Sequence, residues 1–313
     1  MEIKKTIIPA DKTGEPLAGF PEREYIFFTV RYNHHRDLCL SSANELLDKE
    51  DWRECQCVLC LPESYDPQGE ETQLILACHG AGRVVDHASN HIGGVQYVQD
   101  CLDNGYAALD VCGSEENGLT MGCPEHIAAL YKAYRYAIKH YNLSQRVLVA
   151  GASMGGQTAM NFANMFPGLV IAVGMFYPRL HMEGMTVDGH YCIGSWDKEV
   201  RAADGLTQKE RIGKIYHFPD AYQWHEDTTI GFNPHRSRSF INSEGQRVVF
   251  PPCPIKIWQG LADVVVDPVM VEEYVNCVRR GGSYIELRKI DGIGHSQNDV
   301  MHRELTMWFN RFI

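Results

Sequence analysis

The chain has 313 residues, of which 44% are hydrophobic and 22% are charged, and this length allows one large domain with an insertion or two modest domains. Lys and Arg total 29 against 40 Asp and Glu, which gives a formal net charge of −11 without any basic run. This balance excludes nucleic acid and anionic membrane surfaces from the partners that we expect.

The sequence also predicts a cellular compartment. The stretch MEIKKTIIPADKTGEP has no apolar core, so we expect no signal peptide, and no window approaches the roughly 20 apolar residues of a membrane span. We therefore expect a cytoplasmic protein whose 11 cysteines are free thiols. Cys55, Cys57 and Cys60 form C-x-C-x-x-C, but they lie in a strand-like run without a fourth ligand at a usual spacing. We predict buried thiols there and no metal site.

Eight apolar runs with strand character recur along the chain, and amphipathic helical patterns separate the later ones. The runs are YIFFTV (25–30), CQCVLCL (55–61), QLILAC (73–78), YAALDV (106–111), RVLVA (146–150), LVIAVGMF (169–176), PIKIWQ (254–259) and YIELRKI (284–290). Apolar residues repeat at helical spacing in 125–141, in 268–280 and in the last segment. This alternation predicts an α/β fold with a mostly parallel, eight-stranded sheet flanked by helices.

Residues 181–250 interrupt the alternation. They are polar and have little clear periodicity, and six aromatics are spread among the charges: Trp196, Tyr216, Phe218, Tyr222, Trp224 and Phe232. A stretch of this length without strong elements is usually functional or disordered, and the aromatics argue against disorder. We predict a cap at 181–250, inserted into a core formed by 1–180 and 251–313. Trp196, Tyr222 and Trp224 either form the core of this cap or line a substrate pocket.

The run at 146–150 leads into GASMGG (151–156), and a helical pattern follows directly. The motif G-x-S-x-G at a strand-to-helix turn lifts a serine hydroxyl clear of the backbone, as a nucleophile requires. Such a turn strains the serine and crowds its neighbours, which is why Gly151 and Gly155 flank it. We predict that Ser153 is a nucleophile. The alternative is a glycine-rich turn with an incidental serine.

An acid and then a base are expected downstream of the nucleophile. IKIWQGLADVVVDP ends a strand and offers Asp263 and Asp267, but Asp267 precedes a proline and an amphipathic helix, which is typical of an N-cap. We therefore predict that Asp263 is the acid, with Asp291 as an alternative. His295, in IDGIGHSQNDV between the last strand and the last helix, is the predicted base.

The same sheet edge offers a candidate oxyanion hole. HGAG (79–82) ends another strand, and its small residues would let a backbone N–H approach a substrate carbonyl oxygen. We predict that the amides of Met154 and Ala81 bind the oxyanion, with Gly80 as the alternative to Ala81. We expect His79 to hold this loop in place.

Together, GASMGG, HGAG, Asp263 after WQGLAD and His295 in GIGHS resemble the α/β-hydrolase superfamily. The run at 58–82 is similar to the branch of prolyl-oligopeptidase-like, feruloyl-esterase-like and dienelactone-hydrolase-like enzymes. This resemblance covers residues 24–180 and 251–313 and implies the α/β-hydrolase fold. Two features depart from the branch: Ser153 stands where dienelactone hydrolases have cysteine, and we expect no β-propeller of the kind that precedes the core in large oligopeptidases.

The function that we predict is a cofactor-free serine esterase. His295 takes the proton of Ser153 as it attacks a carboxylic ester, Asp263 holds the imidazole, and water then hydrolyses the acyl-enzyme. The expected partner is a small-molecule ester.

Two other functions stay open. The first is an amide-bond hydrolase such as a small exopeptidase, in which Glu115 and Glu116 would hold a substrate ammonium; these residues otherwise belong to a solvated acidic loop. The second is a non-catalytic binding protein on a hydrolase scaffold, because one fold hosts many functions.

Overall fold

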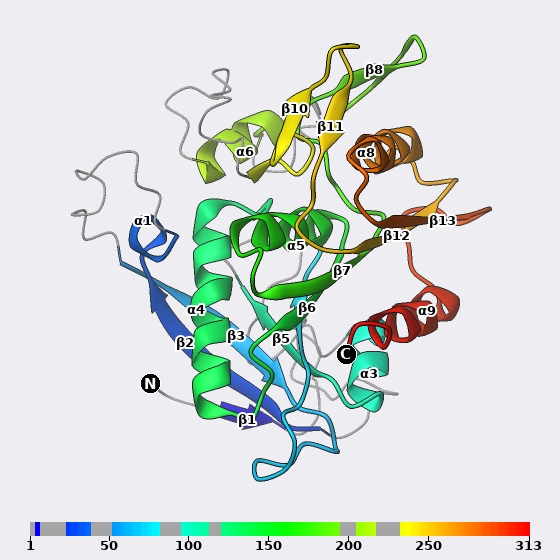
Figure 1. The fold of residues 1–313 in the computed structure, drawn as a ribbon. Helices are drawn as coiled ribbons and strands as arrows, with labels where there is room; N and C mark the ends of the chain where they lie inside the picture. The colour runs from blue at the N-terminus through cyan, green and yellow to red at the C-terminus, as the bar shows by residue number, and fades with distance from the viewer. Residues whose placement is uncertain are drawn as a thin grey trace.

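The computed structural model describes residues 4–6, 23–38, 52–81, 95–112, 120–194, 205–216 and 232–313. A sheet in the order β1-β2-β3-β5-β4-β6-β7-β12-β13 runs through the molecule (Figure 1). Its strands are β1 (Lys4–Thr6), β2 (Tyr25–Tyr32), β3 (Arg53–Cys60), β4 (Leu74–Cys78), β5 (Ala107–Val111), β6 (Val147–Ala152), β7 (Val170–Phe176), β12 (Ile255–Gly260) and β13 (Ile285–Ile290). All eight predicted strands are present, and β1 adds a short ninth strand at the edge.

The sheet is mixed. Strands β5, β4, β6, β7, β12 and β13 are parallel neighbours, whereas β1, β2 and β3 join the edge of β5 in antiparallel pairs. The prediction of a mostly parallel sheet is therefore confirmed. Because parallel strands end at one edge, the loops after β4, β6, β7, β12 and β13 come together there.

Helices cover both faces of the sheet and form two separate apolar clusters. Helices α4 (Pro124–His140), α5 (Met154–Met165) and α8 (Pro268–Arg280) pack on one face. Helices α3 (Gln96–Asp103) and α9 (Asp299–Phe309) pack on the other. Successive strand residues serve opposite faces, so Ile26 joins the first cluster and Tyr25 the second. The helices predicted at 125–141 and 268–280 are confirmed.

Helix α8 begins as its sequence predicts. The Asp267 side chain accepts a hydrogen bond of 2.9 Å from the Val269 amide, and Pro268 occupies the first turn. This N-cap satisfies one of the donors at the start of the helix. Asp267 is thus an N-cap residue, as its position before Pro268 predicts, and it is not the acid of the candidate site.

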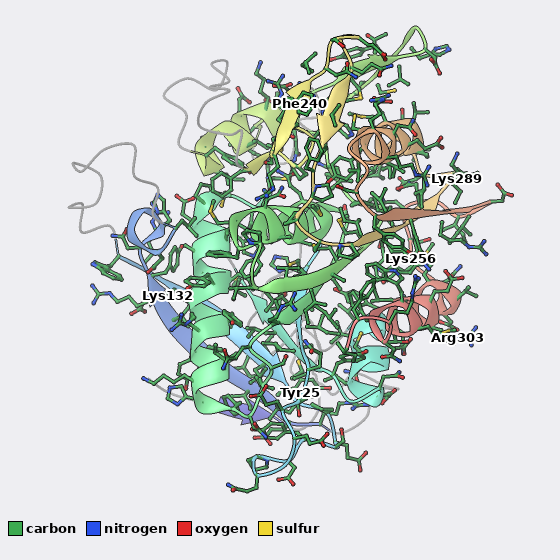
Figure 2. All side chains as sticks on the ribbon, viewed as in Figure 1. Tyr25, Lys132, Phe240, Lys256, Lys289 and Arg303 are labelled. Carbon is green, nitrogen blue, oxygen red and sulfur yellow. The ribbon has the colours of Figure 1, made fainter. Side chains whose placement is uncertain are left out.

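Residues between 181 and 250 form small elements outside the main sheet. The structure describes β8 (Met185–Val187), β9 (His190–Cys192), α6 (Gln208–Ile215), β10 (Ser239–Ile241) and β11 (Arg247–Val249). The strands pair as two antiparallel hairpins, and Phe240 marks the β10–β11 hairpin in Figure 2. Tyr216, at the end of α6, donates a hydrogen bond of 2.8 Å to the Met121 carbonyl and so ties this region to the core.

The aromatics of that region divide into two groups. Tyr216 and Phe232 are buried in the cluster that contains α5. Trp196, Phe218, Tyr222 and Trp224 lie outside the described residues. The division into core and cap, and the role of the tryptophans, therefore stay predictions.

The C-x-C-x-x-C cysteines lie on β3 and are buried. Cys57 belongs to the apolar cluster on the α4 side, whereas Cys60 belongs to the cluster on the α9 side. The sheet separates these two thiols, so they do not converge on one ligand. Burial raises the pKa of both thiols far above the ordinary range. Within the described ranges, every helix is too short or too polar to cross a membrane.

Candidate active site

The turn between β6 and α5 presents Ser153 at the carboxyl edge of the sheet. Ser153 is the N-cap of α5 and has φ 54° and ψ −118°, a backbone conformation that side-chain-bearing residues rarely adopt. Its amide donates to the Phe176 carbonyl at 3.0 Å, and its carbonyl accepts from the amides of Gly156 and Arg179. The surrounding backbone therefore holds the strained residue in place.

Glycines are required around this turn for steric reasons. A Cβ at Gly151 would lie 2.2 Å from the Gly155 carbonyl oxygen. A Cβ at Gly155 would lie 2.1 Å from the carbonyl oxygen of Cys78, at the end of β4. Both obstacles are backbone atoms, which cannot rotate away. The glycines thus allow α5 to begin in contact with the neighbouring strand.

His295 and Asp263 form a hydrogen-bonded chain with Ser153. Nε2 of His295 lies 2.9 Å from Oγ of Ser153, and Nδ1 lies 2.8 Å from Oδ2 of Asp263. With the proton on Nδ1, the imidazole donates to the carboxylate and its Nε2 accepts from the serine hydroxyl. His295 is thus within hydrogen-bond distance of both Ser153 and Asp263, although 142 residues of sequence separate it from Ser153.

The Asp263 carboxylate is fixed from several directions. Oδ1 accepts from the amides of Val265 (2.8 Å) and Val266 (2.9 Å), and Oδ2 accepts a longer bond of 3.3 Å from the Gln259 side chain. The side chain is fully buried, and these donors stabilise its negative charge. Asp291, the alternative acid, is exposed in the turn after β13.

The loop after β4 lies against the nucleophile. A Cβ added to Gly80 would be 3.9 Å from Cβ of Ser153, and Ala81 lines the same cleft. Met154 is the first residue of α5, where backbone N–H groups have no partner four residues earlier in the helix. Met154 thus follows Ser153 directly and Ala81 lines the same cleft as Ser153, and their oxyanion role remains a prediction. Gly82 lies outside the described residues.

Beneath this loop, His79 belongs to a buried polar cluster. Its Nδ1 lies 3.0 Å from Oδ2 of Asp110, and its ring stacks on that of His126 at 5.4 Å. Burial and the neighbouring His79 hold the pKa of His126 well below its ordinary value, so that imidazole is neutral. One ligand atom from each of these three residues lies within 4.8 Å of the others, so they are the described residues that could approach a metal. Because Nδ1 of His79 is already bonded to Asp110, we interpret the cluster as support for the loop.

A cleft of about 610 Å³ opens beside Ser153, His295 and Ala81. Among its residues without a role in the sequence analysis are two that follow β7, Tyr177 and Arg179. The Tyr177 ring packs on the His295 imidazole, with 4.3 Å between ring centroids, and Arg179 lines the cleft two residues later. Both lie in the loop after β7. Their position just after a predicted strand was the feature of the sequence that could have placed them at this edge of the sheet. Glu115 and Glu116 lie outside the described residues.

Comparisons with known proteins identify the fold. No protein-family model and no curated protein matches the sequence. Among solved structures, S-formylglutathione hydrolase from Agrobacterium tumefaciens matches with a TM-score of 0.60 and 14% identity, over 93% of this chain and 96% of that chain. Est1E from Butyrivibrio proteoclasticus, with ferulic acid bound, matches with a TM-score of 0.54 and 16% identity, over 83% and 95%.

Longer peptidases are similar as well. The acylaminoacyl peptidase from Pyrococcus horikoshii matches with a TM-score of 0.60 and 14% identity, over 99% of this chain and 47% of that chain. The chain spans only 36% of a puromycin-hydrolyzing peptidase from Mycobacterium tuberculosis and 37% of a Bacteroides ovatus chain that also matches. The chain therefore has the α/β-hydrolase fold, as the sequence motifs predict.

Proposed function

We propose that the protein is a serine hydrolase that cleaves carboxylic esters through an acyl-enzyme intermediate. The observation that carries this proposal is the continuous chain from Oγ of Ser153 through His295 to Asp263, with distances of 2.9 and 2.8 Å. A nucleophile within hydrogen-bond reach of a base, which is itself oriented by a buried carboxylate, is the arrangement that activates a serine.

Each residue then has one task in the reaction. His295 removes the proton from Ser153 as Oγ attacks the acyl carbonyl, and it later returns that proton to the departing alcohol. Asp263 keeps the imidazole in the required tautomer and stabilises its cation. The amides of Met154 and Ala81 receive the oxyanion of the tetrahedral intermediate. Water repeats these steps on the acyl-enzyme and releases the acid.

Support for ester substrates comes from two of the similar structures, S-formylglutathione hydrolase and Est1E with ferulic acid bound, of which this chain covers 96% and 95%. The similar peptidases match over 36% and 47% of their own length. An amide-bond hydrolase is the second candidate, because those peptidases share the fold.

The test is hydrolysis of p-nitrophenyl esters from acetate to decanoate by wild type and by Ser153→Ala. We expect the variant to lose turnover by a factor of at least about 10⁴ while its circular dichroism and melting temperature stay close to those of wild type. Ser64→Ala, in an exposed turn, is the matched control and should keep full activity.

Further measurements separate the alternatives. Hydrolysis of aminoacyl p-nitroanilides at rates above those of the esters would favour the amide-bond hydrolase. If Ser153→Ala turned over esters as fast as wild type does, or if a fluorophosphonate probe failed to label Ser153, the serine hydrolase proposal would be wrong.

A further inference from the structure

One wall of the cleft beside Ser153 is formed by α3, α9 and the loop that joins β13 to α9. Helices α3 and α9 lie side by side on the same face of the sheet (Figure 1). From this wall, Gln96, Ser296, Gln297 and His302 line the cleft. The proposed reaction gives none of these four side chains a task.

His302 is held firmly in this wall. It is buried, and its ring packs against those of Tyr97 and Phe176. Burial lowers the pKa of the imidazole, although the carboxylates of Asp100 and Asp299 act in the opposite direction. The imidazole is therefore neutral at pH 7 and has one N–H to donate.

The His302 imidazole sets the direction of the Gln297 side chain. Nε2 of His302 lies 3.1 Å from Oε1 of Gln297, whereas Nδ1 of His302 lies 3.7 Å from Oδ2 of Asp100, too far for a hydrogen bond. The proton is therefore on Nε2 of His302, which donates to Oε1 of Gln297. The amide nitrogen of Gln297 is left for the cleft, and among the described residues none accepts a hydrogen bond from it.

Gln96 presents the complementary atom. Its Nε2 donates a hydrogen bond of 2.9 Å to Oδ1 of Asp100, one turn later in α3, so its Oε1 is left for the cleft. The wall thus offers an amide donor from Gln297 and an amide oxygen from Gln96, and neither carries a charge. A hydroxyl group both donates and accepts, so it can bind to either one. An alkyl group would displace water from both without replacing its hydrogen bonds.

The order of residues after His295 places this wall on the alcohol side of the ester. In the proposed reaction His295 returns a proton to the departing alcohol oxygen, so that oxygen lies beside its imidazole. Ser296 and Gln297 are the next two residues of the same loop, and both line the cleft. The predicted oxyanion donors, Ala81 and Met154, belong to other segments and receive the carbonyl oxygen. The alcohol part of the ester is therefore the part that meets Gln297.

We propose that Gln297 binds a hydroxyl group on the alcohol part of the substrate, with Gln96 as a second contact, and that the preferred substrates are esters of small polyols. His302 is a positioning residue that acts through Gln297. This inference rests on the proposed hydrolase function and adds the chemical class of the alcohol. Esters of simple alkanols are then poorer substrates, because their alkyl groups leave both amides without a partner.

The experiment compares two esters with the same acyl group. The polyol ester is glyceryl monobutyrate, and the alkyl ester is propyl butyrate, which has the same carbon skeleton in its alcohol and no hydroxyl groups. The ratio of their kcat/KM values, measured in a pH-stat, is divided by the ratio of their rates in alkaline hydrolysis, which corrects for the better leaving group in glycerol. We expect this corrected ratio to be about 3 to 10 in wild type, the range of one neutral hydrogen bond.

Variants assign the preference to Gln297. In Gln297→Leu the corrected ratio should fall most of the way to one, because leucine has a similar size and no amide. Gln68→Leu, in the exposed loop before β4, is the matched control and should leave the ratio unchanged. Because the ratio is the readout, a general loss of activity cancels. A corrected ratio near one in wild type, or an unchanged ratio in Gln297→Leu, would overturn the inference, while Ser153-dependent hydrolysis of both esters would leave the hydrolase function standing.

His302 is tested through the same ratio. His302→Leu removes the donor to Oε1 of Gln297, so the corrected ratio should fall part of the way toward one. His302→Gln keeps an N–H donor and should restore part of the preference. Equal losses on both esters in His302→Leu, with no change in the ratio, would show that His302 acts through packing alone and would exclude the positioning role.

A binding measurement tests the site if neither ester is cleaved. Glycerol monobutyl ether, which cannot be hydrolysed, should raise the melting temperature of wild type more than that of Gln297→Leu, and it should slow the labelling of Ser153 by a fluorophosphonate more strongly in wild type. Equal effects on both proteins, or no effect on either, would refute the hydroxyl site. A retained difference without any Ser153-dependent ester turnover would count against the proposed function alone.

Discussion

Two regions of the molecule bring the candidate site together, and they differ in the contacts that hold them. The turn between β6 and α5 is held by close backbone contacts, in which glycines touch carbonyl oxygens of neighbouring segments. The loops after β12 and β13 share such a contact, since a Cβ at Gly260 would lie 2.2 Å from the Ile293 carbonyl oxygen, and they add hydrogen bonds that converge on the Asp263 side chain. The difference teaches that backbone contacts position Ser153, whereas a polar side chain also helps to position its partners.

The largest expected effect is on activity and comes from the loop region. Asp263→Asn keeps the side-chain volume but replaces the acceptor for Nδ1 of His295, so the imidazole loses its required tautomer. We expect kcat to fall about 10⁴-fold, with the fold retained in circular dichroism and fluorophosphonate labelling slowed in parallel. Asp267→Asn is the matched control, since asparagine caps a helix as well as aspartate does, and it should keep full turnover. Full activity in Asp263→Asn would contradict the assignment of the acid.

A substitution in the turn between β6 and α5 should lower the stability of the fold, whereas Asp263→Asn lowers activity. Gly155→Ala places a methyl group 2.1 Å from the Cys78 carbonyl oxygen, and this clash can be relieved only by moving β4 or α5. We expect the free energy of unfolding in urea to drop by about 3 kcal/mol or more. At Gly168 an added Cβ meets no atom within 4 Å, so Gly168→Ala should change stability by less than about 0.5 kcal/mol. Equal effects of the two variants would show that the close approach is not maintained in solution.

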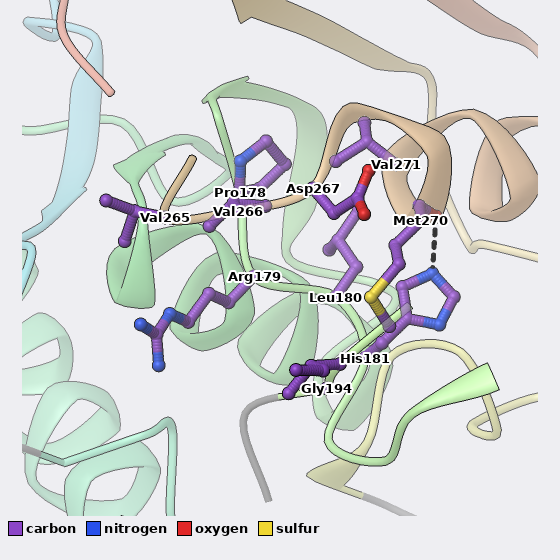
Figure 3. Close-up of a pocket in the computed structure, with 11 residues that line it drawn as sticks. Pro178, Arg179, Leu180, His181, Gly194, Val265, Val266, Asp267, Met270 and Val271 are labelled. Atoms are coloured by element: carbon purple, nitrogen blue, oxygen red, sulfur yellow. Dashed lines mark hydrogen bonds between the residues drawn. The ribbon is translucent and has the colours of Figure 1, made fainter. Parts of the chain in front are cut away.

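The smallest expected effect is a change in stability with pH, and it comes from the buried His181 beside the loop region. His181 donates a hydrogen bond of 2.6 Å to the Met270 carbonyl in the first turn of α8, just beyond the Asp263 loop (Figure 3). Burial lowers the pKa of His181 to about 4, and the nearby Arg247 acts in the same direction. His235 stacks on its ring, and its pKa is likewise lowered by burial and by His181.

The direction in which stability changes with pH follows from proton uptake by the unfolded chain. Between pH 6.5 and about 4 the unfolded chain binds a proton at residue 181 that the folded chain excludes, so stability falls as pH falls through this window. His181 accounts for at most about 3 kcal/mol of the loss in the free energy of unfolding across this window. Urea unfolding at pH 7 and at pH 4.5 measures it: His181→Gln should show a smaller loss than wild type, whereas exposed His140→Gln should show the same loss. An unchanged pH dependence in His181→Gln would exclude this role.

Local patterns in the sequence determined much of the fold. The apolar runs located eight strands, and the Asp-Pro pair located the start of α8, because burial and capping depend on residues close together in the chain. The strand, glycines and helix around Ser153 were predictable for the same reason. A ninth strand, β1, carries no such pattern, since it has three residues and two of them are lysines.

Only the tertiary structure decided which distant groups meet. It placed Asp263 rather than Asp291 beside His295, paired His79 with Asp110, and brought Arg179 into the cleft next to Ser153. These contacts depend on the order of strands in the sheet, where β5 and β4 exchange places relative to the sequence. The physical reason is that a hydrogen bond or a charge acts over a few ångströms of space, and the sequence shows only distance along the chain.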